Sequence, residues 1–215
     1  MTVQTTTLPS GLRIVTDGYD SELVTISIAV ETGTCWEPPH LNGLAHFQEH
    51  MAFKGTHKRT AQQITEDIES YGGYLNACTG KDVTSFYAGV LREDMAVALD
   101  VLSDIVCNST LPPDEFELER NVIYQEMRDV EDNPVDWLGD RFMETAFTGG
   151  LGMPILGTME TLPKCSVEDL WLFIHDHYTA NRVIVGAAGG VRHAIFVEKA
   201  PKAFAGLLWD VVKPA

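Results

Sequence analysis

The chain has 215 residues, of which 45% are hydrophobic and 21% charged, a composition typical of a globular protein with a sizeable buried core. Its 15 Lys and Arg residues against 31 Asp and Glu residues give a formal net charge of −16 at pH 7. Because this charge repels phosphate, we expect no nucleic-acid partner, whereas basic peptides would be attracted.

The first part of the chain predicts a β-hairpin, a strand and two helices. Residues 5–18 contain two β-prone runs around a Pro-Ser-Gly turn, which indicates a hairpin. Residues 23–33 alternate branched apolar residues with smaller or polar ones, the pattern of a strand with one face on a core. A helix capped by Asn42 is expected over residues 42–54, and a capping-box pattern predicts a second helix over residues 60–71.

The rest of the chain predicts further strands and a series of helices. In order, we expect strands at 74–80 and 83–91, helices at 93–108, 112–133, 135–147 and 166–178, a buried strand at 182–190, then a weaker helix and a tail. This order favours a two-layer α+β fold, in which a mostly antiparallel sheet packs against helices. No repeat or linker divides the chain, so we expect a single domain over residues 1–215.

The N-terminal segment and the cysteines indicate a compartment. The segment MTVQTTTLPSGLRIV shows no basic region followed by an apolar one, and no run approaches the ~18–20 apolar residues of a membrane span. The cysteines form no C-x-x-C pair, which favours a reducing compartment with the thiols as small core residues: Cys35, Cys78, Cys107 and Cys165. We therefore expect a cytoplasmic protein without a membrane partner.

The segment GLAHFQEHMAFKGT, residues 43–56, carries two histidines and a glutamate within little more than one helical turn. Because residues four apart on a helix lie one above the other, His46 and His50 share a face and can bind one divalent ion. Glu49 lies beside them, where it can hydrogen-bond a metal-bound water. H-x-x-E-H is the reversed form of the H-E-x-x-H zinc-peptidase motif. The alternative, two histidines on a solvent-exposed face, is disfavoured by the apolar flanking residues.

A catalytic zinc site needs a third protein ligand and one open position. The acidic helix offers five candidates: Glu115, Glu117, Glu119, Glu126 and Glu131. Glu119 and Glu126, seven residues apart, share a helical face with Val122 and Ile123. We hypothesise that Glu126 binds the metal and that Glu119 orients a ligand or the catalytic water. The alternative for any one of these glutamates is that it is a solvent-exposed charge on the helix and takes no part in a metal site.

These segments resemble the pitrilysin/insulinase family, most closely its mitochondrial-processing-peptidase-like branch. The resemblance rests on GLAHFQEHMAFKGT, on ERNVIYQEMRDVEDNP and on the similarity of GGYLNACTGKDVTSFYAGV, PILGT and HYTANRVIVGAAGG, which together cover nearly the whole chain. It implies one zinc ion per chain on His46, His50 and Glu126. It also implies Glu49 as the general base and Glu119 as a nearby supporting acid.

The resemblance also assigns a role to the strand YLNACT. In the family, the corresponding strand is a sheet edge that pairs with an extended peptide substrate, with Asn76 and Ala77 at the matching positions and Cys78 beside them. From the residues alone, an ordinary core strand is equally plausible.

The chain departs from the family pattern in three places. Gln48 stands where the family commonly has an apolar residue, and TGGLGMPILG lacks the His-Pro often found before Leu-Gly. Family chains typically contain two such domains, the second supplying an arginine and a tyrosine that help to hold substrate, whereas this chain resembles only the first. We expect either a fragment or a short subunit that forms a homodimer or pairs with a homologous partner.

The expected function is therefore a zinc-dependent metalloendopeptidase that hydrolyses peptides, basic peptides being one candidate class, with a zinc-bound water activated by Glu49. The first alternative is a peptide-binding subunit, non-catalytic or weakly active alone, that needs a partner domain to complete its site. The second is a lyase of related fold, S-ribosylhomocysteinase, which also uses H-x-x-E-H. Its third ligand is a cysteine, for which Cys107 is the candidate.

Overall fold

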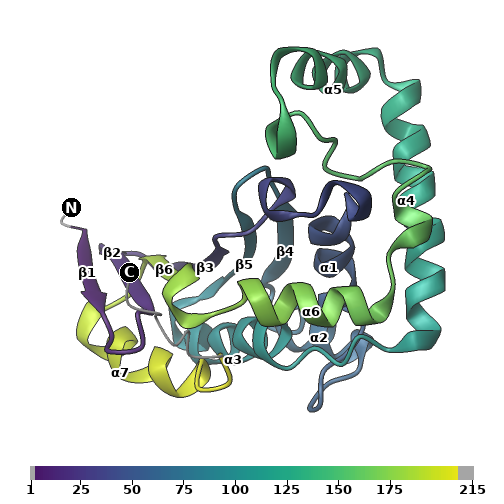
Figure 1. Cartoon of the computed structure of the whole chain (residues 1–215). Coiled ribbons are helices and arrows are strands. Elements are labelled where there is room, and N and C mark those ends of the chain that lie inside the picture. Colours follow the sequence, from purple (N-terminus) through teal and green to yellow (C-terminus); the bar gives the residue numbers. More distant parts are fainter. Residues whose placement is uncertain (1–2, 208–215) are drawn as a thin grey trace.

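The computed structural model describes residues 3–207 and shows a six-stranded sheet with helices packed against it (Figure 1). The strand order is β1 (Gln4–Thr7), β2 (Arg13–Gly18), β6 (Val183–Gly189), β3 (Leu23–Val30), β5 (Thr84–Leu91) and β4 (Tyr74–Thr79). Strands β2 and β6 run parallel, and every other neighbouring pair is antiparallel. The predicted two-layer α+β fold is therefore confirmed.

Seven α-helices occur in the described residues: α1 (Leu44–Ala52), α2 (Ala61–Glu69), α3 (Met95–Cys107), α4 (Pro113–Asp132), α5 (Pro134–Ala146), α6 (Val167–His177) and α7 (His193–Ala203). Capping boxes begin α2 at Thr60 and α6 at Ser166, as the sequence predicted. The predicted helix near the C-terminus corresponds to α7, and the predicted tail beyond residue 207 lies outside the described residues.

The central strand β3 shows why the sheet has one buried face. Val24, Ile26, Ile28 and Val30 are at most 1% exposed, whereas the residues between them are exposed or half-buried. Side chains alternate between the two faces of a strand, so the apolar set faces the helical layer, as predicted. The strand ends at Val30, three residues before its predicted end at residue 33.

Helix α4 extends beyond the edge of the sheet and carries α5 at its far end (Figure 1). No residue of α5 is buried, and its outward side chains Val135, Leu138 and Phe142 are 62–76% exposed. Among residues 3–207, no helix combines the length and the apolar character that crossing a membrane requires.

The segment that follows α1 is fixed by a charged cluster around Arg59. Its guanidinium donates to Asp67, Asp104 and Asp100 at 2.7, 2.8 and 2.5 Å. The Asp104 side chain is fully buried, and it also accepts a hydrogen bond from Thr56 at 2.6 Å. Arg59 therefore ties the segment after α1 to both α2 and α3.

Replacing Arg59 by Ala should lower the free energy of unfolding by about 3 kcal/mol, because it leaves the buried Asp104 carboxylate without its cation. For a chain of this size, that corresponds to a loss of roughly 6–12 °C in Tm, measured by circular dichroism. Arg59→Lys should recover only part of it, since one ammonium cannot serve three carboxylates. Arg92→Ala, which removes an exposed pair with Glu22, is the matched control. An unchanged Tm for Arg59→Ala would contradict this account.

Candidate metal centre

The N-terminus of α1 is capped by a carboxylate from outside the helix. The buried Glu37 accepts hydrogen bonds from the backbone N–H groups of Gly43 and Ala45 at 2.9 and 2.6 Å. Asn42, the predicted capping residue, instead donates its side-chain N–H to Glu37 at 2.8 Å, so that prediction is wrong. Burial raises the pKa of Glu37, whereas the hydrogen bonds that it accepts favour its ionised form.

An aromatic stack fixes α4 along α1. Phe47 and Phe116 are stacked with ring centroids 4.3 Å apart and an interplanar angle of 9°. The guanidinium of Arg120 lies over both rings, 5.6 Å from the Phe47 centroid and 4.9 Å from that of Phe116. Because Glu119 and Glu126 follow Phe116 by one and about three turns of α4, this stack sets where the two carboxylates meet α1.

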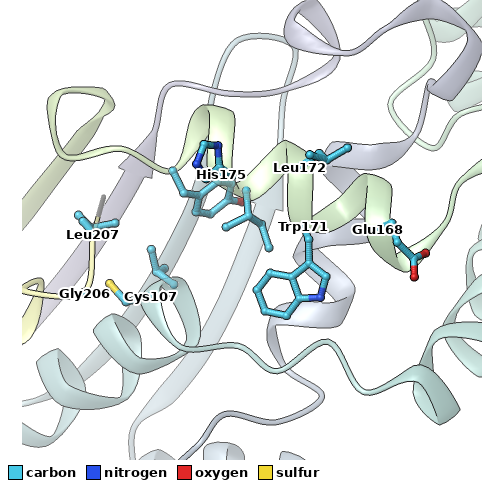
Figure 2. Close-up of a pocket in the computed structure, with 10 residues that line it drawn as sticks. Cys107, Glu168, Trp171, Leu172, His175, Gly206 and Leu207 are labelled. Atoms are coloured by element: carbon cyan, nitrogen blue, oxygen red, sulfur yellow. The ribbon is translucent and has the colours of Figure 1, made fainter. Parts of the chain in front are cut away.

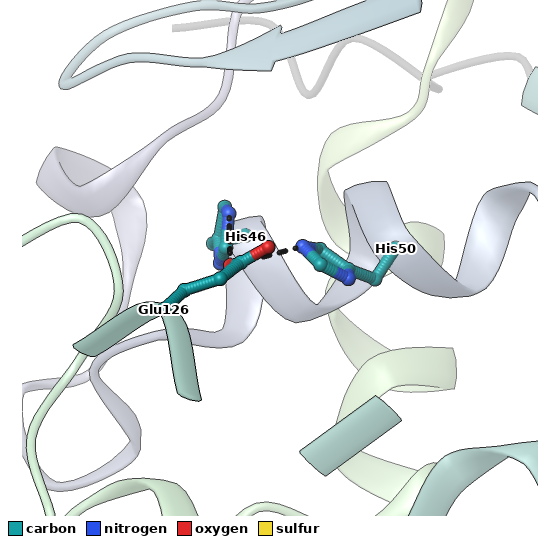
Figure 3. A group of neighbouring side chains, drawn as sticks. All are labelled: His46, His50 and Glu126. Carbon is teal, nitrogen blue, oxygen red and sulfur yellow. Dashed lines mark ion pairs between the residues drawn. The ribbon is translucent and has the colours of Figure 1, made fainter. Parts of the chain in front are cut away.

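His46, His50 and Glu126 converge between α1 and α4 (Figure 3). The Nε2 atoms of His46 and His50 lie 3.7 and 3.4 Å from Oε2 of Glu126. Each residue offers one potential ligand atom, and these atoms all lie within 4.8 Å of one another. The structure thus brings together the three residues that the sequence predicted as zinc ligands.

Glu119 lies on the other side of His50. Its Oε2 accepts a hydrogen bond from Nδ1 of His50 at 2.9 Å, and its Oε1 lies 2.6 Å from Nζ of Lys54. A carboxylate at Nδ1 favours the tautomer whose Nε2 lone pair is free to bind a metal ion. Of the two roles predicted for Glu119, this geometry favours orienting a ligand. Val122 was predicted on the same face as Glu119. It is 43% exposed, whereas Ile123 is buried, because successive residues of a helix are ~100° apart and Val122 lies on the solvent side of this face.

The local charges favour the ionisation states that metal ligands require at His46 and Glu126, but they favour the protonated form of His50. Burial and the neighbouring His50 lower the pKa of His46, so its ring is neutral at physiological pH. The hydrogen bond to His50 lowers the pKa of Glu126, which keeps this carboxylate ionised. Burial lowers the pKa of His50, but its contacts with Glu126 and Glu119 outweigh burial and raise it overall.

These residues fit a zinc ion. Two imidazole nitrogens and one carboxylate oxygen form a donor set typical of catalytic zinc, which keeps its fourth position open. The two histidine side chains are only 11% and 15% exposed, whereas that of Glu126 is 38% exposed. One side of the cluster is therefore dry, and the other is open to an incoming molecule.

Glu49 and the strand β4 lie next to this cluster. Oε2 of Glu49 accepts a hydrogen bond from Oγ1 of Thr79, the last residue of β4, at 2.5 Å. Burial raises the pKa of Glu49, and the Thr79 hydrogen bond opposes that rise. A carboxyl group with a raised pKa beside a metal site is well suited to accept and return a proton.

Strand β4 is the last strand of the sheet and pairs only with β5 among the described residues. It is therefore an edge strand rather than a central strand of the sheet, and its role in binding an extended peptide stays a prediction. Asn76 and Cys78 are exposed and Ala77 is half-buried. The expectation that all four thiols are small core residues is wrong for Cys78, because its side chain lies on the uncovered face of this edge strand.

Cys107 lies in a different part of the molecule. It lines a cavity of about 660 Å³ between α3 and α6, together with Trp171 and His175 (Figure 2). Neither His46 nor His50 lines this cavity. Burial also raises the pKa of Cys107 to about 12, which disfavours the thiolate that binds metals. Among the described residues, the group that could hold a metal ion contains no cysteine, which the lyase alternative needs.

Comparisons with known proteins agree with this geometry. Residues 13–159 match the model of the insulinase family, peptidase family M16. A probable mitochondrial-processing peptidase subunit beta of Arabidopsis thaliana is 41% identical over 95% of this chain and 39% of its own length. An uncharacterized zinc protease of Streptomyces coelicolor is 40% identical over 94% of this chain and 45% of its own length. The chain thus spans less than half the length of these relatives.

Two solved structures share the fold over the whole chain. A protease from Helicobacter pylori superposes with a TM-score of 0.92 at 25% identity, and the match covers 53% of that protein. A peptidase M16 inactive domain from Pseudomonas fluorescens superposes with a TM-score of 0.88 at 18% identity, over 54% of its length. The second likeness concerns the fold alone.

Replacing Glu126 by Gln should weaken Zn²⁺ binding by more than the roughly 10–100-fold typical of residues that only hydrogen-bond to a ligand, because an amide replaces an anionic donor. Competition with a chromophoric chelator measures the affinity. Asp129→Asn, an exposed position three residues along α4, removes the same charge and should leave the affinity nearly unchanged. Equal affinities for the two variants would remove Glu126 from the metal centre.

Proposed function

Because the chain belongs to the insulinase family (peptidase family M16), we propose that it is a zinc-dependent metalloendopeptidase with one zinc ion on His46, His50 and Glu126. The observation that carries this proposal is the convergence of three potential ligand atoms within 4.8 Å between two packed helices. Relatives named as zinc proteases support the choice of metal.

The chemistry follows from the neighbours of the cluster. Zinc, when bound, polarises the scissile carbonyl and lowers the pKa of a coordinated water. Glu49 then takes the proton of the attacking water and returns it to the leaving amine. The hydroxyl of Thr79 fixes the Glu49 carboxylate for both transfers.

We propose peptides as substrates, bound in an extended form along the outer edge of β4 at Asn76, Ala77 and Cys78. Main-chain hydrogen bonds provide affinity there without strict sequence requirements. Because Thr79 ends the same strand and contacts Glu49, a peptide on this edge lies next to the base.

Two features favour basic peptides among these substrates. The net charge of −16 attracts cationic chains. A cavity of about 340 Å³ between α4 and α5, which Met127 next to Glu126 helps to line, contains four carboxylates and one guanidinium: Glu131, Asp140, Glu144, Glu160 and Arg141.

The alternative is a peptide-binding subunit that is inactive or weakly active alone and pairs with itself or with a homologous subunit. One observation favours it: several relatives are named as subunits of mitochondrial-processing peptidase. The exposed apolar side chains of α5 offer a surface for such a partner. A cytoplasmic location stays a prediction.

Glu49→Gln should retain zinc and lose peptidase activity by roughly 10²–10⁴-fold, because the amide cannot accept the proton of the attacking water. Turnover of a basic fluorogenic peptide and metal content measure the two properties. Glu66→Gln, an exposed position on α2, is the matched control. Unchanged turnover by Glu49→Gln would show that the base is another group. A zinc-loaded chain that cleaves nothing until a partner is added would favour the subunit function.

Thr79→Val should lower kcat about tenfold and leave KM nearly unchanged, because it removes the hydrogen bond to Glu49 and keeps the backbone edge of β4. Thr79→Ser, which retains the hydroxyl, should keep most of the rate. The two variants are compared by steady-state kinetics on the same peptide. Equal kcat values for Val and Ser at this position would exclude a role for the hydroxyl.

A further inference from the structure

Two carboxylates of α4 bridge three basic side chains spaced four residues apart in the sequence, His46 and His50 on α1 and Lys54 in the segment after it. Glu126 lies between His46 and His50, at 3.7 and 3.4 Å from their Nε2 atoms. Glu119 lies between His50 and Lys54, at 2.9 and 2.6 Å from their nitrogens. Lys54 lies two residues beyond the last residue of α1, and its contact with Glu119 places it in the same row of charged groups as both histidines.

The contact between Lys54 and Glu119 differs from an ordinary surface ion pair. The Glu119 side chain is 7% exposed and that of Lys54 is 26% exposed, so both charges are largely removed from water. The two oxygens of Glu119 are divided between two partners, Oε2 to Nδ1 of His50 and Oε1 to Nζ of Lys54. A carboxylate held at both oxygens has a fixed plane, and that plane directs the hydrogen bond to His50.

We propose that Lys54 is a positioning residue of the metal centre: its ammonium group holds the Glu119 carboxylate, which in turn holds the His50 ring with Nε2 directed at the metal position. The proposal rests on the zinc function proposed above. The contact through which Lys54 acts is its ion pair with Glu119.

The physical reason is the burial of Glu119. Without Lys54, this carboxylate keeps a hydrogen bond at one oxygen, and its charge loses its cation in a poorly solvated position. The carboxylate can then turn toward solvent, which releases the His50 ring to other orientations. Loss of a partner that orients a metal ligand typically weakens metal binding 10–100-fold. Lys54 is one step further away, so we expect about a tenfold loss.

Simple electrostatics predicts the opposite result. Lys54 is a positive charge near a cation site, and removing it reduces repulsion of Zn²⁺. If Lys54 acted only through its field, Lys54→Met would bind Zn²⁺ more tightly. At alkaline pH, where protons do not compete with Zn²⁺ for the imidazole rings, weaker binding instead indicates a change in the arrangement of the ligands. The sign of the change therefore separates positioning from a field effect.

The experiment measures the Zn²⁺ affinity of the full chain by chelator competition. Lys54→Met keeps the length of the side chain and removes the charge; Lys54→Arg keeps a cation that can reach Glu119. Lys58→Met, which breaks a pair with Asp100 whose partners are 58% and 48% exposed, makes the same change in net charge four residues away and is the matched control. We expect about tenfold weaker binding for Lys54→Met only, with circular dichroism showing that all variants are folded.

A double-mutant cycle shows whether the effect passes through Glu119. In a Glu119→Gln background, Lys54→Met should have no further effect on Zn²⁺ affinity, because the group that it positions has been removed. The proposal is overturned if Lys54→Met binds Zn²⁺ as tightly as Lys58→Met does, if Lys54→Arg is as weak as Lys54→Met, or if the two substitutions are additive.

A readout without metal separates this proposal from the zinc function. In the metal-free chain at alkaline pH, nitrogen NMR of the imidazole rings should show His50 protonated at Nδ1, and Lys54→Met should shift it toward a mixture of tautomers. If the unsubstituted chain fails to bind zinc, the proposed function fails, whereas this measurement still tests Lys54. An unchanged His50 tautomer in Lys54→Met overturns the positioning role even when zinc binds.

Discussion

The antiparallel packing of α1 against α4 is the constraint on which the rest of the site depends. The stacked rings of Phe47 and Phe116 fix the register of the two helices, and the carboxylates of α4 meet the basic side chains of α1 only in that register. A slip of one turn, about 5.4 Å, would separate every pair. Phe47 and Phe116 therefore determine where the charged groups of the site meet, although neither ring takes part in the chemistry.

Burial explains why each charged group near this seam has a specific partner. Glu37 at the start of α1, Glu119 beside His50 and Asp104 under the following segment are all at most 6% exposed. Each is neutralised or hydrogen-bonded by groups from another part of the chain. An unpartnered buried charge costs several kcal/mol, so these contacts hold α1 at both ends and along its length. The helix that carries H-x-x-E-H is thus anchored by contacts to other parts of the chain before any ligand arrives.

The sequence predicted the features that depend on short-range patterns. Alternation in residues 23–33, the capping boxes at Thr60 and Ser166, and the four-residue spacing of His46 and His50 each reflect local geometry, and the structure reproduces them. The local rule failed at Asn42, because a carboxylate five residues upstream competes better for the helix N-terminus than a neutral amide does.

Contacts between distant elements were beyond local reasoning. The Glu49–Thr79 hydrogen bond depends on how β4 lies against α1, and nothing near either residue signals it. Lys54 had a detectable signal, since it extends the His46 and His50 spacing by one more turn. At the end of a helix, however, a lysine is ordinary, because it interacts favourably with the helix dipole. The role proposed for Lys54 follows from its contact with Glu119, which the sequence alone does not show.

The open edge of β4 has a consequence for the behaviour of the chain in solution. Natural sheets protect their edges with lysine, proline or bulges, and the strand YLNACT contains neither lysine nor proline. A charged side chain that protected this edge would also hinder its pairing with an extended peptide. Misfolded chains and other copies of this chain can pair with the same edge, so peptide binding and aggregation would compete for the same backbone groups.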